Sequence, residues 1–179
     1  MMEIEIRAEL KNGKKLLDTL KKTKGIKFVG TYKEDDRYLK HGTDIERSLI
    51  LRIRRKKDKS ILTFKGKAKG KDTAWPDVDL PLPDPKTLEG LLLSNNYVDV
   101  VRIKKDRSMF KKGDFEINVD KIETLGWFVE IEGRGNAKDR KKVEAAIHVL
   151  LAELGIKKEQ IIEKGYVPLA LERMAGAGK

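Results

Sequence analysis

Residues 2–10 read Met-Glu-Ile-Glu-Ile-Arg-Ala-Glu-Leu, an alternation of apolar and charged side chains. Successive side chains of a β-strand point to opposite faces, so this period of two predicts a strand. Ile4, Ile6 and Ala8 would share one face, and the charged residues would share the other. Residues 126–133, Gly-Trp-Phe-Val-Glu-Ile-Glu-Gly, repeat the pattern with acidic side chains at alternate positions. Each strand therefore has an apolar face to bury and a charged face that needs polar surroundings.

Similar patterns divide the rest of the chain into helices and strands. Apolar residues three or four apart predict helices over residues 13–24, 85–94, 138–154 and, more briefly, 165–174. Alternation predicts further strands over residues 27–39, 48–55, 60–67, 74–82, 97–107 and 114–121. The Gly- and Lys-rich stretch 66–72 predicts a loop. Strand, helix and several strands follow one another twice, which predicts a single domain over residues 1–174 with two pseudo-symmetric halves and a flexible tail at 175–179.

Composition narrows the class of protein. The chain has 179 residues, of which 39% are apolar, and its 15 glycines bring the total to about 47%, as in globular proteins. It has no cysteine and only two histidines, which excludes a disulfide scaffold and a Cys-type zinc site. Neither a signal peptide nor an apolar run long enough to cross a membrane is present, so a cytoplasmic protein without a membrane partner is expected. The net charge of +11 predicts a polyanionic ligand.

Charged residues of both signs recur as pairs on single strand faces. If helices cover the apolar faces of a curled sheet, these charged faces meet inside, where dehydrating unpaired charges is costly. A wet channel filled by a ligand avoids that cost. Carboxylate pairs supply oxygen ligands for Mg²⁺ or Mn²⁺, and arginine and lysine bind phosphate oxygens. The pattern therefore predicts a metal–polyphosphate site, with the pairs Glu3/Glu5, Glu130/Glu132, Arg52/Arg54 and Lys65/Lys67.

The order of these motifs resembles that of the CYTH superfamily, also called triphosphate tunnel metalloenzymes. The matching stretches are Glu3-Ile-Glu5-Ile-Arg7, Arg52-Ile-Arg54, Lys65-Gly-Lys67, Lys105-Asp-Arg107, and Asp120 followed by Leu125-Gly-Trp-Phe-Val-Glu130-Ile-Glu132. The closing Lys164-Gly165-Tyr166 resembles the C-terminal element of the family. The resemblance implies an α+β fold, a closed eight-stranded antiparallel β-tunnel with flanking helices.

The resemblance also implies roles for particular residues. Divalent metal, Mg²⁺ or Mn²⁺, would be held by Glu3, Glu5, Asp120, Glu130 and Glu132. The triphosphate would be bound by Arg52, Arg54, Lys65, Lys67 and Arg107, with Arg7 and Lys105 included as motif positions. No residue is assigned to the chemical step itself.

Two departures from the family pattern restrict the mechanism and the substrate. The first motif usually ends in lysine, but this chain has Arg7, which does not readily accept a proton. No aromatic residue precedes the lysine strand in Asp58-Lys59-Ser60-Ile61, so thiamine triphosphate is not expected.

Simple alternation also conflicts with the motif in residues 100–106, because it turns Arg102, rather than Lys105, away from Val101 and Ile103. A bulge would reconcile the two.

Three functions remain open at this point. The family member that the chain most resembles is a class IV adenylate cyclase, which converts ATP to cyclic AMP and pyrophosphate. The alternatives are a triphosphatase acting on inorganic or nucleoside triphosphates, and a non-catalytic polyphosphate- or nucleotide-binding module. The expected partner is a small-molecule triphosphate, ATP or tripolyphosphate, with a homodimer left open. Nucleic acid is not favoured, because the basic run 54–57 has no interleaved aromatic residue.

Overall fold

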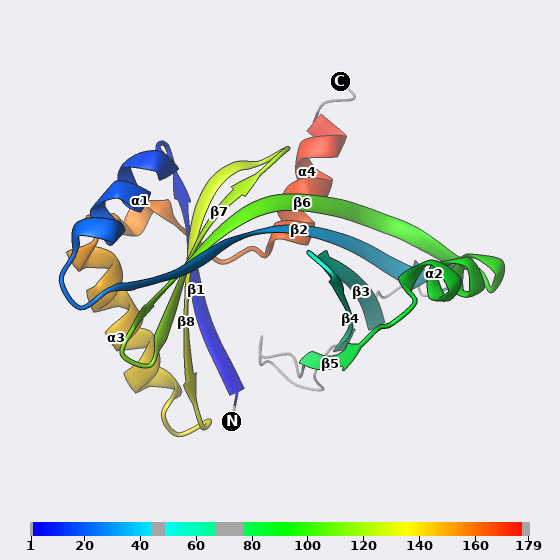
Figure 1. The fold of residues 1–179 in the computed structure, drawn as a ribbon, viewed down its shortest axis with the longest axis horizontal. Coiled ribbons are helices and arrows are strands. Elements are labelled where there is room, and N and C mark those ends of the chain that lie inside the picture. The colour runs from blue at the N-terminus through cyan, green and yellow to red at the C-terminus, as the bar shows by residue number, and fades with distance from the viewer. Residues whose placement is uncertain (1, 44–48, 67–76, 177–179) are drawn as a thin grey trace. The chain divides into compact units, whose positions relative to one another are not determined.

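The computed structural model describes residues 2–43, 49–66 and 77–176 of the chain (Figure 1). The helices are α1 (Gly13–Lys22), α2 (Pro85–Ser94), α3 (Arg140–Glu153) and α4 (Tyr166–Gly176), with a short 3₁₀-helix η1 (Lys158–Gln160). The strands are β1 (Met2–Leu10), β2 (Lys27–His41), β3 (Leu49–Lys56), β4 (Lys59–Gly66), β5 (Asp77–Pro81), β6 (Tyr97–Lys112), β7 (Phe115–Ile122), β8 (Gly126–Gly135) and β9 (Ile161–Ile162). In this described part, no helix combines the length and the apolar character needed to cross a membrane.

The strands form a mostly antiparallel sheet in the order β5-β4-β3-β2-β6-β7-β8-β1-β9. Among the described residues the sheet has nine strands, so the expected number of eight is wrong. The additional strand is β9, which pairs with β1 through two residues and is too short to show any alternation in the sequence. Closure of the sheet into a tunnel stays a prediction.

The predicted elements agree with the observed ones, apart from their ends. β6 runs to Lys112, five residues beyond the expected end, and Phe110 in this extension is fully buried. Of the strand expected over 74–82, residues 77–81 form β5, and residues 74–76 lie outside the described residues. The predicted loop at 66–72 lies outside the described residues from position 67 onward.

The chain divides into two compact units. Unit 1 consists of residues 1–32 and 105–179, and unit 2 of residues 33–104. The long strands β2 and β6 each contribute to both units. The division does not follow the two halves of the sequence, because unit 1 joins the beginning of the chain to its end. A single domain over residues 1–174 stays a prediction.

Unit 1 has an apolar core between its strands and the helices α1 and α3. Ile4, Ala8 and Leu10 of β1 are buried there, while Glu3, Glu5 and Glu9 are exposed, as the alternation predicts. Helix α3 contacts β1 and β8, and α1 contacts β7 and β8. Figure 1 shows both helices on one side of these strands. The opposite face of the same strands is therefore left for the charged residues.

Unit 2 has a smaller core centred on Leu39, Leu51 and Ile53 from β2 and β3. Helix α2 packs Leu88 and Leu92 against this cluster. The helix begins at Pro85, directly after Asp84, whose carboxylate accepts a hydrogen bond from the Thr87 amide at 3.1 Å. Aspartate at the N-cap and proline at the first helical position both favour a helix start, which explains why the boundary is sharp.

Candidate functional site

Three carboxylates come together on the charged face of unit 1. Glu5 on β1 lies opposite Glu132 on β8, and Arg7 lies opposite Glu130. Directly opposed residues of paired strands share a face, so the register gathers all four side chains. Carboxylate oxygens of Glu5, Glu130 and Glu132 lie within 4.8 Å of one another. We call this group the carboxylate trio.

Two arginines contact the trio. Arg7 donates from Nε to Glu130 Oε2 at 2.5 Å and also contacts Glu5. Arg107 on β6 donates from Nη2 to Glu130 Oε1 at 2.9 Å. The same guanidinium forms a two-pronged pair with Asp120 on β7, both N···O distances being 2.7 Å. Buried Glu130 is thus held between two cations, and the fork of the Arg107 guanidinium lets it bond Asp120 and Glu130 at the same time.

Tyr166, the first residue of α4, contacts both the acids and the bases around the trio. Its hydroxyl donates to Asp120 Oδ2 at 3.0 Å, and both residues are buried. Its ring centroid lies 5.2 Å from Arg7 Cζ and 5.5 Å from Lys105 Nζ, within the range of cation–π contacts. The sequence offered one signal for this residue, its place in the Lys164-Gly165-Tyr166 element, but assigned it no role.

The two acids of β8 have opposite protonation behaviour. Burial opposes ionisation of Glu130, but the neighbouring Arg7 and Arg107 charges hold its pKa well below the usual value. Burial, followed by the Glu130 charge, raises the pKa of Glu132 to about 9. Burial also raises the pKa of Tyr166, and the charges of Glu130 and Asp120 add to that effect. At neutral pH Glu130 is therefore ionised and Glu132 is protonated.

This arrangement fits a divalent cation. The trio offers hard carboxylate oxygens, which Mg²⁺ and Mn²⁺ prefer. Protonation of Glu132 shows that three closely spaced carboxylates do not all carry charge without a further cation. A divalent ion in place of that proton would remove the repulsion.

The other two predicted metal ligands lie outside the trio. Glu3 is exposed on β1, and one of its oxygens lies 3.3 Å from Arg134 Nη2. Asp120 is bonded to Arg107 and Tyr166. Metal binding by Glu3 and Asp120 stays a prediction that the observed contacts do not by themselves require.

The face assignment in β6 corrects one interpretation of the sequence. Lys105 and Arg107 are buried, whereas Arg102 is exposed and pairs with Asp35 through Nε at 2.7 Å. The alternation is continuous, since Val101 and Ile103 are buried on the same side of the strand as Lys105 and Arg107. The sequence left Lys105 and Arg102 open as alternatives beside Arg107, and the Arg102 alternative is wrong because it assumed that apolar and charged residues occupy opposite faces of the strand. The pairing of residues 105–112 with β7 shows no bulge.

Two of the predicted phosphate ligands of unit 2, Arg52 and Arg54, are bonded to polar neighbours within that unit. Arg52 donates from Nη2 to the Thr63 hydroxyl at 2.8 Å. Arg54 forms a two-pronged pair with the buried carboxylate of Asp36, both distances being 2.7 Å. Lys65 belongs to β4, and Lys67 lies outside the described residues. The sequence left Asp36 out of the site, and its bond to Arg54 becomes visible only from the pairing of β2 with β3.

Asn118 on β7 is another residue that sequence analysis did not select. It is fully buried, and its Nδ2 donates to Glu116 Oε1 at 3.0 Å and to Glu132 Oε1 at 3.3 Å. The amide thereby fixes one oxygen of Glu132. This contact makes Asn118 a positioning residue for the trio.

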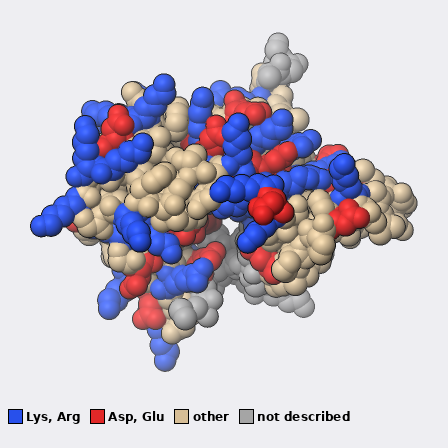
Figure 2. All heavy atoms as spheres, viewed as in Figure 1, with Lys and Arg blue, Asp and Glu red and all other residues tan. Residues whose placement is uncertain are grey.

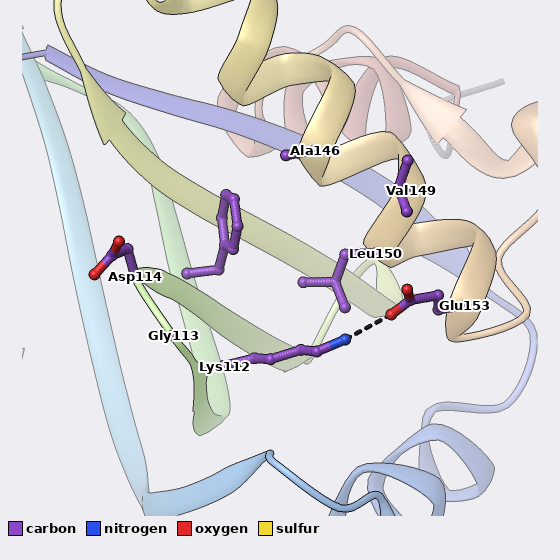
Figure 3. A pocket seen from close by; sticks show the side chains of 8 residues that line it. Lys112, Gly113, Asp114, Ala146, Val149, Leu150 and Glu153 are labelled. Atoms are coloured by element: carbon purple, nitrogen blue, oxygen red, sulfur yellow. Dashed lines mark hydrogen bonds and ion pairs between the residues drawn. The ribbon is translucent and has the colours of Figure 1, made fainter.

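A pocket of about 350 Å³ lies elsewhere in unit 1, between the β6–β7 turn and α3 (Figure 3). Its lining includes Phe115, Leu150 and the ion pair of Lys112 with Glu153, whose N···O distance is 2.5 Å. None of the predicted site residues lines this pocket. The pocket is lined largely by apolar side chains and one ion pair, so it lacks a set of residues that could bind several phosphates or a metal ion. The carboxylate trio therefore remains the candidate site.

A family model described as the CYTH domain matches residues 1–166. The chain belongs to the CYTH family. Members of this family act on triphosphates, as cyclases or as triphosphatases, and are metal-dependent. A Methanocaldococcus jannaschii relative named "putative adenylate cyclase" is 29% identical over 174 residues, covering 94% of this chain and 98% of its own.

Solved structures support the fold of this CYTH protein. A protein from Pyrococcus horikoshii OT3 is 25% identical, with a TM-score of 0.76 over 94% of this chain and 99% of its own. A Hippeastrum protein, described as a "putative adenylyl cyclase" with a dominant triphosphatase activity, is 17% identical. Its TM-score is 0.69 over 97% of this chain and 95% of its own. At 17% identity the second likeness concerns the fold alone.

Proposed function

We propose that this CYTH protein is an enzyme that acts on a triphosphate with the help of a divalent cation, Mg²⁺ or Mn²⁺. The observation that carries the proposal is the carboxylate trio with its two arginines in unit 1. A non-catalytic phosphate-binding module would need the bases, but it would gain nothing from three acids held so closely together. Family membership supports the same class of substrate.

The proposed roles follow from the contacts of each side chain. Glu5, Glu130 and Glu132 would hold the cation, which neutralises phosphate charge and orients the chain of phosphates when it is bound. Arg7 and Arg107 keep Glu130 ionised, and Asn118 and Tyr166 fix its neighbours. Glu3 and Asp120 are proposed as additional acids near the cation.

The basic residues of the motifs are proposed to bind phosphate oxygens. They are Arg52, Arg54, Lys65 and Lys67 in unit 2, and Arg7, Lys105 and Arg107 in unit 1. Arg7 is bonded to two carboxylates and keeps its proton, so the group that accepts a proton in the reaction is another one. We further propose that residues 1–174 act as one CYTH domain.

Conversion of ATP to cyclic AMP and pyrophosphate is the reaction we favour, supported by the name of the Methanocaldococcus relative. Here the ribose 3′-oxygen would attack the α-phosphorus and pyrophosphate would leave. Hydrolysis of the terminal phosphate is the second candidate, supported by the triphosphatase activity described for the Hippeastrum protein. The same acids and bases serve both reactions, because the outcome depends on which phosphorus faces the nucleophile.

The double variant Glu130→Gln/Glu132→Gln tests the proposal. We expect at least about a hundredfold loss of cation-dependent turnover of ATP and tripolyphosphate, because loss of a cation's carboxylates removes the ion that organises the phosphates. Glu123→Gln/Glu163→Gln changes two exposed acids of the same unit and should retain activity. Unchanged turnover in a folded Glu130/Glu132 variant would disprove the role of the trio.

A further inference from the structure

An exposed, strongly basic surface lies on unit 1, along α1 and the start of β2. Residues 11–27 contain seven lysines and one aspartate, a net charge of 7 − 1 = +6. All seven lysines are exposed. Figure 2 shows basic side chains gathered over the region where Figure 1 places α1. We call this group the α1 lysine surface: Lys11, Lys14, Lys15, Lys21, Lys22, Lys24 and Lys27.

Within residues 11–27, Asp18 is the one acid that offsets the seven positive charges of this surface. In the part of the chain that the structure describes, none of the seven ammonium groups forms an ion pair, whereas Arg140 on α3 pairs with Glu144 at 2.8 Å. Lys14, Lys15, Lys21 and Lys22 lie on the helix face opposite Leu16 and Leu20, which are buried in the core. Like charges on one helix face repel one another. A polyanion bound along this face would relieve that repulsion.

An aromatic ring is exposed beside these lysines. Phe28 on β2 is 46% exposed, and the Lys21 ammonium lies 5.9 Å from the centre of its ring. The centre of the Phe28 ring lies 5.1 Å from that of Phe110, which is fully buried. This contact with the core fixes the position of the Phe28 ring. Lysines along a track with an exposed ring beside them are the combination that binds a strand's phosphates and stacks one of its bases.

We propose that the α1 lysine surface, together with Phe28, binds single-stranded nucleic acid without sequence preference. An anionic membrane is the less suitable partner, because a membrane-binding helix inserts its apolar face into the lipid, and that face of α1 is buried in the core. The surface lies on the helix-covered side of unit 1, so this binding is independent of the proposed triphosphate reaction.

The test measures binding of a fluorescent oligonucleotide of about 16 nucleotides by anisotropy over a range of salt concentrations. The α1 variant carries Lys14→Gln, Lys15→Gln, Lys21→Gln and Lys22→Gln. A control variant carries Lys59→Gln, Lys86→Gln, Lys104→Gln and Lys111→Gln, four exposed lysines elsewhere. Both variants have the same net charge, 11 − 4 = +7, so a difference between them reports the place of the charges rather than their number.

The wild-type protein should bind, and log K should fall linearly with log salt. In the α1 variant this slope should be smaller in magnitude by about 3, since each lost phosphate contact on a single strand contributes about 0.7. The control variant should keep the wild-type slope. Phe28→Leu should weaken binding roughly 5- to 100-fold, whereas Phe28→Trp should restore it, because only an aromatic ring stacks on a base.

Several results would overturn the proposal. They are equal losses in the α1 and control variants, absence of oligonucleotide binding by the wild type, and binding only to phosphatidylserine vesicles or to long-chain inorganic polyphosphate. Turnover of ATP and tripolyphosphate is measured on the same samples. Turnover should be equal in the wild type and the α1 variant, and the oligonucleotide result stands by itself if neither protein shows turnover.

Discussion

Glu130 and Glu132 are two positions apart on β8, yet one is ionised and the other protonated at neutral pH. The difference comes from their partners, since Arg7 and Arg107 both donate hydrogen bonds to Glu130, whereas Glu132 accepts one from the amide of Asn118 and lies 3.9 Å from Arg107 Nη1. Glu132 is therefore the group whose proton a divalent cation would displace. Two pH effects follow at this scale.

Cation binding should release close to one proton per ion at pH 7. The pKa of Glu132 is raised to about 9, so the group is protonated below that pH and must lose its proton to become a ligand. Apparent affinity should rise about tenfold per pH unit and level off above pH 9. Titration calorimetry in buffers of different ionisation enthalpy counts the protons. Binding without proton release at pH 7 would contradict the assignment.

Without divalent cations, folding stability should decrease as pH rises. The folded-state pKa of Glu132 lies above its ordinary value of 4.5, so between pH 4.5 and about 9 the folded protein binds more protons than the unfolded chain. The stabilisation that comes from Glu132 is fully present below pH 4.5 and is lost as the pH rises toward about 9. In urea unfolding, Glu132→Gln should make the free energy of unfolding depend less on pH. Glu123→Gln should leave the pH dependence as in the wild type.

Removing the Tyr166 hydroxyl tests the contact between α4 and the buried Asp120. Tyr166→Phe should lower the free energy of unfolding by about 1–3 kcal/mol, the usual cost of a lost hydrogen bond to a buried charge. Denaturant unfolding measures this change. Tyr97→Phe is the matched control, because the Tyr97 hydroxyl makes no hydrogen bond within the described residues, and it should change stability by less than about 0.5 kcal/mol. An equal loss in both variants would show that the Asp120 contact is not stabilising.

At the scale of elements, α1 is positioned by the contact between Gly13 and the Trp127 ring on β8. The Asn12 side chain caps the helix by accepting from the Lys15 amide at 3.2 Å, which fixes its first turn. A β-carbon at Gly13 would lie 2.1 Å from the indole. The glycine is thus required for the close approach of helix and strand.

Two glycine substitutions should therefore have opposite effects. Gly13→Ala should destabilise the protein by about 1–3 kcal/mol, because the indole must move out of a packed position. Gly90→Ala, in the middle of α2 with nothing within 4 Å of the new methyl group, should stabilise it by about 0.5–1 kcal/mol. Thermal unfolding distinguishes the two, and a neutral Gly13→Ala would contradict the packing described.

Strand alternation predicted which residues share a face, but not always which face is covered. In β1 the apolar face is the buried one, so the prediction succeeded. In β6, Val101 and Ile103 are buried on the same side as Lys105 and Arg107, and pattern alone could not show this. Register supplied the missing information, because pairing with β7 places Arg107 opposite Asp120.

At the scale of the whole molecule, the motifs predicted the family and five candidate metal ligands, three of which form the trio. The contacts that support the trio could be found only from the fold. Glu5, Glu130 and Glu132 each belong to an E-x-E pair, a local signal that the sequence shows directly. Tyr166 lies 46 residues from Asp120, and nothing in the intervening sequence specifies that they meet. The division into two units, one formed from both ends of the chain, likewise follows from long-range pairing rather than from local pattern.

The central claim is that the carboxylate trio makes triphosphate turnover depend on a divalent cation. The most direct test incubates the purified protein with ATP or tripolyphosphate, with Mg²⁺, Mn²⁺ or EDTA, and separates the products by chromatography. We expect cyclic AMP and pyrophosphate from ATP, only with a cation present. Orthophosphate, above all from tripolyphosphate, would establish the triphosphatase alternative within the same claim. No cation-dependent product from either compound, or equal turnover in EDTA, would contradict the claim.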